Sequence, residues 1–551
     1  MTMRPSRRTL LKAATATGLA AAGLGTAGCG ALTREVSGEQ LSSRARLPAP
    51  FRVPLPVPVT ATPTRGPDGG DHYELVQRAA RVEILPGLRT EVWGYDGRFP
   101  GTTLVGRSGR TTTVRVRNEL PVPTSTHLHG GVQAPESDGS PLDLVLPKGY
   151  GSGAGASAHD GHGTHGAHGA HGSMGAHGSQ GEHAGQMRTR PGDWTYTSGA
   201  KTYTYPLEQP ATTLWYHDHR MDFSAPQVWR GLAGLFLVHD DVEDALPLPR
   251  GEKDIPLMIC DRAFEEDGAL RYPSLDPSLT GEPGVEDAYM EGVTGDVVLV
   301  NGAPWPELEV SGTRYRFRIL NTSNARRYRL ALEPGPREGG AFTQVGSDAG
   351  LLRRPVTHDT LPVAPGERFD VVVDFAAYPV GSTVTLVNTL GAGGTRSVMR
   401  FRIVRRERDT SRVPERLAGV PVARAERAVA ERRFDFRLTS GSGGELWTIN
   451  GRPFDSGRVL ARPRLGTVER WRFSSDFHHP VHVHLAHFLV VARGGGPPLP
   501  TDAGWKDTVD VRPYEVVDVL VRFRGHRGRY MLHCHNLEHE DMAMMANFEV
   551  V

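Results

Sequence analysis

A single cysteine near the C-terminus stands among histidines and methionines. His533 and His535 flank Cys534, His539 follows the cysteine by five residues, and Met544 follows it by ten. A thiolate, imidazoles and a soft axial thioether are the ligands of a blue-copper electron-transfer site. Alternate side chains of an extended strand face opposite ways, so Cys534 would point away from its two neighbouring histidines. The spacing therefore predicts two metal sites joined by one short covalent path, an arrangement suited to electron relay.

Three further histidine pairs have the same spacing of two residues, and on strands each pair would project from one face. These pairs are His127 with His129, His217 with His219, and His482 with His484. One such pair is weak evidence, because surface histidines often have this spacing. Together the four pairs supply eight imidazoles, which match a three-metal cluster. A second set, which matches one mononuclear copper, consists of His479, Cys534, His539 and Met544.

The sequence resembles the multicopper oxidases over nearly everything after about residue 70. All four copper signatures of that family are present in order, and the similarity looks closest to the branch of the spore-coat laccase and the bilirubin oxidases. It extends to stretches without ligands at 92–101, 346–352 and 504–508. The resemblance implies an all-β fold of three cupredoxin-like Greek-key β-sandwich domains.

Carried over position by position, the resemblance also implies four copper ions. The type 1 copper would be held by His479, Cys534 and His539, with Met544 as the axial ligand. The type 2 copper would take His127 and His482, one type 3 copper His129, His217 and His535, and the other type 3 copper His219, His484 and His533. The implied reaction oxidises a donor one electron at a time and reduces dioxygen to water. Electrons are expected to enter through the outer edge of His479 or His539.

Reduction of dioxygen consumes protons, so buried acids are expected beside the cluster. Glu540, next to His539, and Asp138, nine residues past His129, match proton-relay acids of the related laccases. The alternative role of each acid is a carboxylate that only orients a histidine. Histidines outside the motif spacing are expected to be ordinary surface or core residues: His478, His487 and His526.

Short alternating stretches such as 112–118 and 315–320 predict strands, with 66 glycines and 42 prolines to make the turns between them. A turn in which an aromatic residue follows a Gly after one or two residues recurs at 95–100, 301–305 and 450–454. The recurrence favours three similar sandwiches over three unrelated hairpins. The net charge of +1, from 63 basic and 62 acidic residues, points to no nucleic-acid partner.

The expected domains cover residues 71–245, 246–405 and 431–551, with a linker at 406–430. Every proposed ligand lies in the first or the third of these, so the cluster must sit at their interface, with the middle domain as a spacer. The first domain carries a Gly/His-rich insertion at 151–187, which is predicted to be disordered. Its two interpretations are a plain solvated loop and a copper-capturing loop.

Residues 1–29 read as a twin-arginine signal peptide, because Arg7 and Arg8 precede a mild apolar stretch. The protein is therefore expected to reach the cell envelope or the outside of the cell. Residues 26–29 resemble a lipobox, and lipidation of Cys29 and ordinary cleavage nearby are equal alternatives. Residues 30–70 contain a Pro-rich run that would form an extended tether or an edge-wrapping arm. Cys260 is expected to be a small buried hydrophobe outside any disulfide.

Three functions from different classes follow. The first is a laccase-like oxidase of phenolic or tetrapyrrole-like donors, which uses dioxygen, acts as a monomer and touches a membrane only through a lipid anchor. The second is a metallo-oxidase acting on Cu(I), Fe(II) or Mn(II) in copper homeostasis. The third, a copper-free structural relative of the cell envelope, is disfavoured because none of the twelve ligand positions is missing. The first two stay open, since donor choice depends on the loops over the type 1 site.

Overall fold

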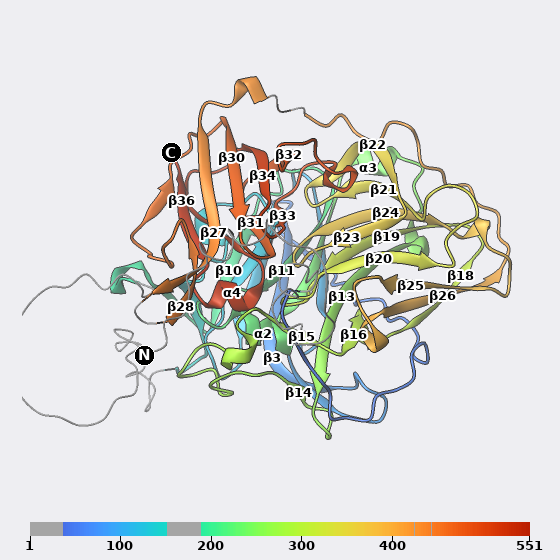
Figure 1. Ribbon diagram of the computed structural model, residues 1–551, viewed down its shortest axis with the longest axis horizontal. Helices are drawn as coiled ribbons and strands as arrows, with labels where there is room; N and C mark the ends of the chain where they lie inside the picture. The colour runs from blue at the N-terminus through green and yellow to red at the C-terminus, as the bar shows by residue number, and fades with distance from the viewer. Residues whose placement is uncertain (1–36, 151–188, 422, 424, 442–443) are drawn as a thin grey trace, which may run out of the picture. The chain divides into compact units, whose positions relative to one another are not determined.

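The computed structural model describes residues 37–150, 189–421, 423, 425–441 and 444–551 (Figure 1). The expected signal peptide and the His-rich insertion lie outside the described residues. Among the described residues, every helix is too short or too polar to cross a bilayer. The described residues form three short α-helices, α2 (Ser224–Arg230), α3 (Asp241–Ala245) and α4 (Leu537–Asp541), and several short 3-10 helices. The expected all-β architecture is confirmed.

The strands form three sandwiches, each built from two sheets. In the first sandwich, one sheet has the order β10 (Ala200–Tyr205), β6 (Thr112–Asn118), β3 (Asp71–Val82) and β2 (Thr64–Arg65), with β4 (Thr90–Tyr95) on β3. The other has the order β5 (Gly101–Arg107), β12 (Ala233–His239), β11 (Thr212–Asp218) and β7 (Thr126–His129). Their buried faces meet in a core that includes Tyr95, Val116, Leu214 and Phe236.

The second sandwich contains the largest sheet among the described residues. One runs in the order β17 (Ala303–Pro304), β16 (Val297–Val300), β13 (Asp254–Phe264), β19 (Arg314–Asn321), β24 (Arg368–Asp374), β21 (Phe342–Ser347) and β22 (Gly350–His358), with β14 (Leu270–Arg271) on β13. The other runs β18 (Glu307–Ser311), β26 (Ser397–Arg405), β25 (Thr383–Asn388), β20 (Tyr328–Glu333) and β23 (Thr360–Val363). Cys260, in β13, is buried in this core as an unpaired thiol.

The third sandwich is drawn from orange to red in Figure 1. One sheet runs β28 (Gly444–Ile449), β27 (Glu431–Gly441), β30 (Val468–Ser475), β34 (Val516–Arg522) and β32 (His487–Arg493). The other runs β29 (Val459–Ala461), β36 (Met545–Val550), β35 (Gly528–Cys534), β31 (His479–Val483) and β33 (Thr508–Val511). Two small sheets, β1 (Glu39–Leu41) with β15 (Val293–Gly295) and β8 (Asp143–Leu146) with β9 (Thr195–Ser198), complete the fold.

The recurring turn adopts one conformation in all three sandwiches. Its first two residues have positive φ at Asp96–Gly97, Asn301–Gly302 and Asn450–Gly451, as a tight turn between twisted strands requires. The side-chain oxygen of the first residue accepts a backbone N–H from a neighbouring strand in each case, at Val76, Met258 and Asp435. The sequence repeat therefore marks the same structural element three times.

The two strands expected from alternation differ in their burial. In β6 the inward valines alternate with more exposed residues, as predicted. In β19, Arg316 and Arg318 are buried as well. Arg316 pairs with Asp370 and Arg318 pairs with Asp254, so both faces of this central strand are covered without leaving a lone buried charge.

The Pro-rich run after residue 47 lies along the edges of two sandwiches. Pro54 bridges Glu307 of β18, and Thr60 bridges Thr103 of β5. Leu55 is buried, and its N–H donates to the Glu307 carbonyl. The segment therefore adds backbone hydrogen bonds to sheet edges in the manner of a wrapping arm.

Candidate metal centre

Four strands from two sandwiches carry the paired histidines. In the first sandwich β11 pairs with β7, so that His217 lies opposite His127. In the third, β31 pairs with β35, so that His482 lies opposite His533. Adjacent strands place directly opposed residues close together on one face. The eight paired histidines, all at most 1% exposed, come together between the two sandwiches.

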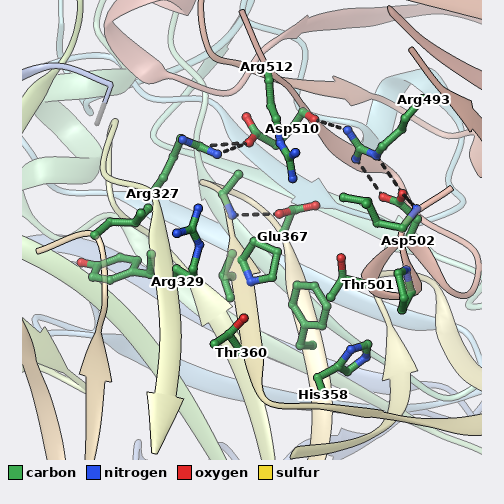
Figure 2. A pocket seen from close by; sticks show the side chains of 18 residues that line it. Arg327, Arg329, His358, Thr360, Glu367, Arg493, Thr501, Asp502, Asp510 and Arg512 are labelled. Carbon is green, nitrogen blue, oxygen red and sulfur yellow. Dashed lines mark hydrogen bonds and ion pairs between the residues drawn. The ribbon is translucent and has the colours of Figure 1, made fainter. Parts of the chain in front are cut away.

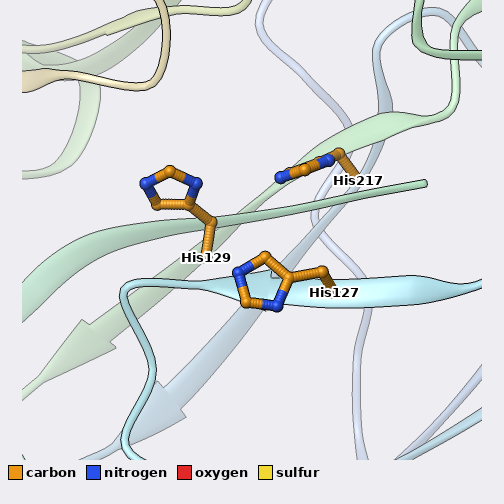
Figure 3. Close-up of side chains that lie close together, drawn as sticks. All are labelled: His127, His129 and His217. Carbon is orange, nitrogen blue, oxygen red and sulfur yellow. The ribbon is translucent and has the colours of Figure 1, made fainter. Parts of the chain in front are cut away.

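The close-up in Figure 3 contains three of these rings. His127 and His129 come from β7 and His217 from β11, with ring centroids 5.5 to 5.9 Å apart. The ring nitrogens of this trio lie within 4.8 Å of one another. Nitrogens of His219, His484 and His533 form a second such group, and those of His127, His482 and His484 a third. His535 joins through His129 and His217, with ring centroids at 5.0 and 5.3 Å.

In these rings one nitrogen makes a hydrogen bond to the surrounding protein, and the other nitrogen faces the other histidines without a hydrogen atom. His484 Nδ1 lies 2.7 Å from a carboxylate oxygen of Asp138, and His533 Nδ1 lies 3.0 Å from the Cys534 carbonyl. With the Asp138 carboxylate ionised, both Nδ1 atoms carry hydrogen, so the two Nε2 atoms present lone pairs only 3.1 Å apart. Two lone pairs at that distance repel unless a cation lies near them.

Other rings of the cluster repeat this pattern. His127, His217 and His482 each place Nδ1 within hydrogen-bond distance of a backbone carbonyl, while the Nε2 atom of each is buried without a partner. A metal-ligating histidine is held in this way, one nitrogen on an acceptor and the other on the ion. The donor set therefore fits a cluster of metal ions.

Burial also fixes the protonation state that ligation needs. It lowers the pKa of these imidazoles: His217 falls to about 4, and the pKa values of His127, His129, His219, His482, His484 and His535 fall well below the ordinary value. A neutral imidazole is the form that binds a metal. These seven rings are therefore in the form that binds a metal at neutral pH.

The mononuclear set assembles at the far side of β35. His479 Nδ1 lies 3.3 Å and His539 Nδ1 3.6 Å from Cys534 Sγ, and the two Nδ1 atoms are 3.1 Å apart. Met544 is fully buried, and its carbonyl accepts the Cys534 N–H. Burial raises the pKa of the Cys534 thiol well above its usual value. A thiolate there needs a cation, so this set also fits a metal ion.

Helix α4 carries His539, and the first sandwich holds that helix in place. The Asp541 carboxylate accepts the backbone N–H groups of Ser224 and Ala225 in α2, at 2.8 and 2.9 Å. This contact fixes the position of His539 relative to Cys534, which comes from the neighbouring strand.

Known proteins match the chain over most of its length. Three family models described as multicopper oxidase match residues 77–149 with 171–243, 280–396 and 430–551. A laccase of Bacillus subtilis (strain 168) is 33% identical, with 90% of this chain and 97% of that protein covered. A bilirubin oxidase of Albifimbria verrucaria is also 33% identical, with 90% of this chain and 81% of that protein covered. This chain belongs to the multicopper oxidase family.

Solved structures agree. A multi-copper oxidase of Pediococcus acidilactici has a TM-score of 0.74 at 29% identity, covering 93% of each chain. The expected cupredoxin-like fold is confirmed. The protein is therefore a copper-dependent oxidoreductase with dioxygen as its electron acceptor.

Both predicted acids of this multicopper oxidase lie against the cluster histidines. Glu540 places its two carboxylate oxygens 3.3 Å from His219 Nδ1 and 3.1 Å from His533 Nδ1. Asp138 lies 2.7 Å from His484 Nδ1 and accepts a hydrogen bond from the Gln133 amide. Burial raises the pKa of Asp138. Each acid is placed to orient a ring and to hold a proton beside it.

The middle sandwich supplies contacts that sequence reasoning missed. Arg368 donates to the Asp507 carboxylate at 2.7 Å, and Asp507 in turn lies 3.0 Å from His129 Nε2. Gly366 packs so tightly that an added Cβ would lie 3.0 Å from His535 Cδ2 and 3.1 Å from His129 Cε1. The sequence did carry a signal, because Asp507 lies in the 504–508 stretch that the resemblance covers.

The two rings at which electrons are expected to enter are covered. The rings of His479 and His539 are both 0% exposed, so neither ring edge reaches the surface. Trp447 stacks on His539 at 3.7 Å between centroids and meets His479 edge-on at 5.4 Å. The Glu291 carbonyl lies 3.2 Å from His539 Nε2. Glu291 covers the site because the 287–292 segment of the second sandwich folds over it. A hydrogen bond from Trp447 Nε1 to the Met290 carbonyl holds this segment against Trp447.

Two of the three histidines that the spacing set aside make ordinary contacts within the protein. His478 lies 3.3 Å from Arg327 Nη1, and His487 Nε2 lies 3.0 Å from the Gly130 carbonyl. Both are buried, and His526 is half-buried. None of the three appears in a described group of metal-binding atoms.

Proposed function

We propose that this multicopper oxidase is laccase-like: it oxidises phenolic or tetrapyrrole-like donors one electron at a time and reduces dioxygen to water. It would hold four copper ions, one type 1, one type 2 and two type 3, in the ligand sets given above. One observation carries the proposal. Cys534 faces His479 and His539, whereas its neighbours His533 and His535 face the other histidines, so one strand joins both sites.

Copper at the Cys534 site would supply one-electron transfer, and copper at the eight imidazoles would supply dioxygen reduction. The chain's own residues arrange the conditions for that chemistry. Trp447 keeps water from the His539 ring by stacking on it. Glu540 and Asp138 can hold protons at carboxylate oxygens within 3.3 Å of imidazole nitrogens, which places acids where dioxygen reduction consumes protons. The backbone acceptors of the Nδ1–H groups keep the rings in the tautomer that ligation needs.

The donor class is supported by the relatives, which are named laccase and bilirubin oxidase. The metallo-oxidase alternative is tested in the same experiment. Copper-loaded protein is assayed with a phenol, bilirubin, Cu(I), Fe(II) and Mn(II), with oxygen uptake as a common readout. We expect kcat/KM for the phenol or for bilirubin to exceed that for each metal ion. A higher kcat/KM for any of the three metal ions would replace the proposal with the alternative.

Copper content is measured on the same preparation. Four coppers per chain, with a blue absorption that disappears on reduction, are expected. Fewer than four coppers in an active preparation would refute the proposed ligand sets without deciding the donor.

We further propose that the protein is exported by the twin-arginine route to the cell envelope as a monomer, with Cys29 as a lipid anchor or a neighbour of the cleavage site. Replacement of Arg7 and Arg8 by lysine should retain the protein inside the cell. Cys29→Ala should release it from the membrane fraction if the cysteine is lipidated, and should leave its distribution unchanged if cleavage is ordinary. Sedimentation of the purified protein tests the monomer.

A further inference from the structure

A hollow of about 280 Å³ lies beside the segment that covers the type 1 site. One wall contains Glu286 and Tyr289, at the two ends of the 3-10 helix η5 (Asp287–Tyr289), and η5 belongs to the covering segment. The other walls come from β1 and the residues after it, the end of β13, and β14 with the two residues after it. Because both ligand rings are covered, a donor must be coupled to them through the protein, and this hollow adjoins the cover.

A second hollow, of about 260 Å³, lies between the second and third sandwiches (Figure 2). Two of its carboxylates are engaged in ion pairs. Asp510 accepts from Arg327 at 2.6 Å, and Asp502 accepts from Arg493 at 2.7 Å. These carboxylates are therefore poor acceptors for the hydroxyl group of an incoming molecule.

The hollow beside the cover combines ring surfaces with an available carboxylate. Tyr272 and Tyr289 are half-buried and line it. The Glu265 carboxylate lies 3.0 Å from Arg44, whereas the Glu286 carboxylate has no polar partner within the part of the chain that the structure describes. Aromatic rings pack against one another offset or edge to face, and a carboxylate accepts the hydrogen of a hydroxyl group. The lining therefore fits an aromatic ring that carries a hydroxyl group.

Tyr272 connects this hollow to the type 1 site. Its ring lines the hollow, and its hydroxyl donates to the Glu538 carboxylate at 2.9 Å. Glu538 is buried in α4 and directly precedes His539. The Asn324 amide and the Val293 N–H also donate to this carboxylate, at 2.8 and 3.1 Å, which fixes its position. One hydrogen bond and a short stretch of covalent chain therefore join the hollow to a proposed type 1 ligand.

We propose that a monocyclic phenol binds in this hollow and that its electron reaches His539 through Tyr272 and Glu538. The inference rests on the proposed laccase-like function, and it names the donor class and the path of the electron. A volume of about 280 Å³ corresponds to about nine waters at roughly 30 Å³ each. That space suits one substituted ring and excludes a tetrapyrrole.

Each oxidation step removes one electron and the hydroxyl proton from the phenol and leaves a neutral phenoxyl radical. The electron passes to the Cys534 site, and dioxygen is its final acceptor. The proton passes along the hydrogen bond to Glu286 and from there to water, because Glu286 is exposed. Tyr272 and Glu538 keep their protons, since they serve only as a bridge for the electron.

Binding is tested on the copper-loaded holoenzyme with 4-nitrophenol, whose electron-withdrawing nitro group makes it hard to oxidise. Isothermal titration should show one-to-one binding. Glu286→Ala should weaken this binding about tenfold, because a hydrogen bond to a charged acceptor is lost. Glu282→Ala is the matched control, since Glu282 is an exposed glutamate of the same loop outside the lining. Arg512→Ala, which alters the hollow of Figure 2, should also bind 4-nitrophenol as the wild type does.

The electron path is tested by mixing the oxidised enzyme anaerobically with saturating 2,6-dimethoxyphenol and following the loss of the blue absorption. Tyr272→Phe keeps the ring but removes the bridging hydroxyl, so this loss should be about tenfold slower. The affinity for 4-nitrophenol and the reduction potential of the type 1 site should be unchanged, which separates a broken path from an altered site. Tyr514→Phe, at a tyrosine that is 72% exposed, should react at the wild-type rate.

The inference is overturned if 4-nitrophenol does not bind, if Glu286→Ala binds it as tightly as Glu282→Ala, or if Arg512→Ala alone weakens binding. It is also overturned if Tyr272→Phe loses its colour as fast as Tyr514→Phe. A wild type that oxidises no phenol refutes the proposed function and this inference together. A wild type that oxidises phenols, with variants that match their controls, refutes this inference alone.

Discussion

The position of single nitrogen atoms decides what the paired histidines can do. His484 and His533 turn protonated Nδ1 atoms to oxygen acceptors and so present two Nε2 lone pairs to each other. Burial lowers the pKa of His484 well below its ordinary value, which keeps that ring neutral. The Glu540 carboxylate contacts rings from two different strand pairs, His219 and His533. The function of this acid can be separated from that of the rings by a conservative substitution.

Glu540→Gln should slow reoxidation of the fully reduced enzyme by dioxygen about a hundredfold, within the range typical of a lost general acid. The amide keeps the size of the side chain but cannot supply a proton. Stopped-flow recovery of the blue absorption measures the rate. The blue absorption of the oxidised variant should be intact, and its loss would assign Glu540 a structural role instead.

His487, which is outside the proposed ligand sets, gives a pH test. Burial lowers its pKa to about 4, so below pH 6.5 the unfolded chain takes up a proton that the folded protein excludes. The stability that depends on neutral His487 is thus present above pH 6.5 and lost as the pH falls toward 4. Replacement by Asn removes this loss.

The destabilisation caused by His487→Asn should therefore be smaller at pH 5 than at pH 7.5, by about 2 kcal/mol. Urea unfolding of both proteins at both pH values gives the difference. An equal or larger destabilisation at pH 5 would contradict the neutral state of this histidine.

The alternation of side chains along a strand places the two candidate metal sites on opposite sides of it, and the sequence predicts this arrangement. Alternation along β35 places Cys534 opposite its neighbours, and the four ligand motifs fall on strands or directly after them, as predicted. The contribution of the second sandwich could not be predicted. Gly366 matters because its backbone approaches two rings from a distant part of the chain, and a glycine without a motif around it gives no sign of such an approach.

Gly366→Ala should lower the copper content of the purified protein. The residue has a φ of +83°, and the added methyl group would press on His535 and His129, so the rings must shift. Metal analysis and the spectrum of the cluster measure the effect. Gly381→Ala is the matched control, since Gly381 has a φ of +88° with nothing within 4 Å of the added atom. Equal copper loss in both variants would mean that backbone strain alone is responsible.

At the scale of the whole molecule, one guanidinium connects all three sandwiches. Arg368, in the second, donates to the Thr213 carbonyl of the first and to the Asp507 carboxylate of the third. The middle sandwich is expected to be a spacer. It also helps to position the ring of His129, because Arg368 binds the Asp507 carboxylate that contacts this ring. Long-range ion pairs of this kind depend on tertiary packing, so sequence spacing does not reveal them.

Arg368→Lys keeps the charge but loses the fork that spans these partners. We expect a loss of about 2 to 3 kcal/mol of stability, because buried acceptors are left without donors. Thermal unfolding of the copper-loaded protein should show a lower Tm, and copper should dissociate faster into a chelator. An unchanged Tm with unchanged copper release would show that the lysine ammonium replaces the guanidinium.

The covering of His539 by Trp447 and Glu291 bears on how the enzyme selects among reductants. A molecule outside cannot lay its own ring against the imidazole, so electrons have to tunnel across the intervening indole or peptide group. The rate of electron tunnelling depends on driving force and distance more than on how closely the shape of the reductant fits the protein surface. Among phenolic donors, the rate of oxidation should therefore follow the midpoint potential of the donor more closely than its shape.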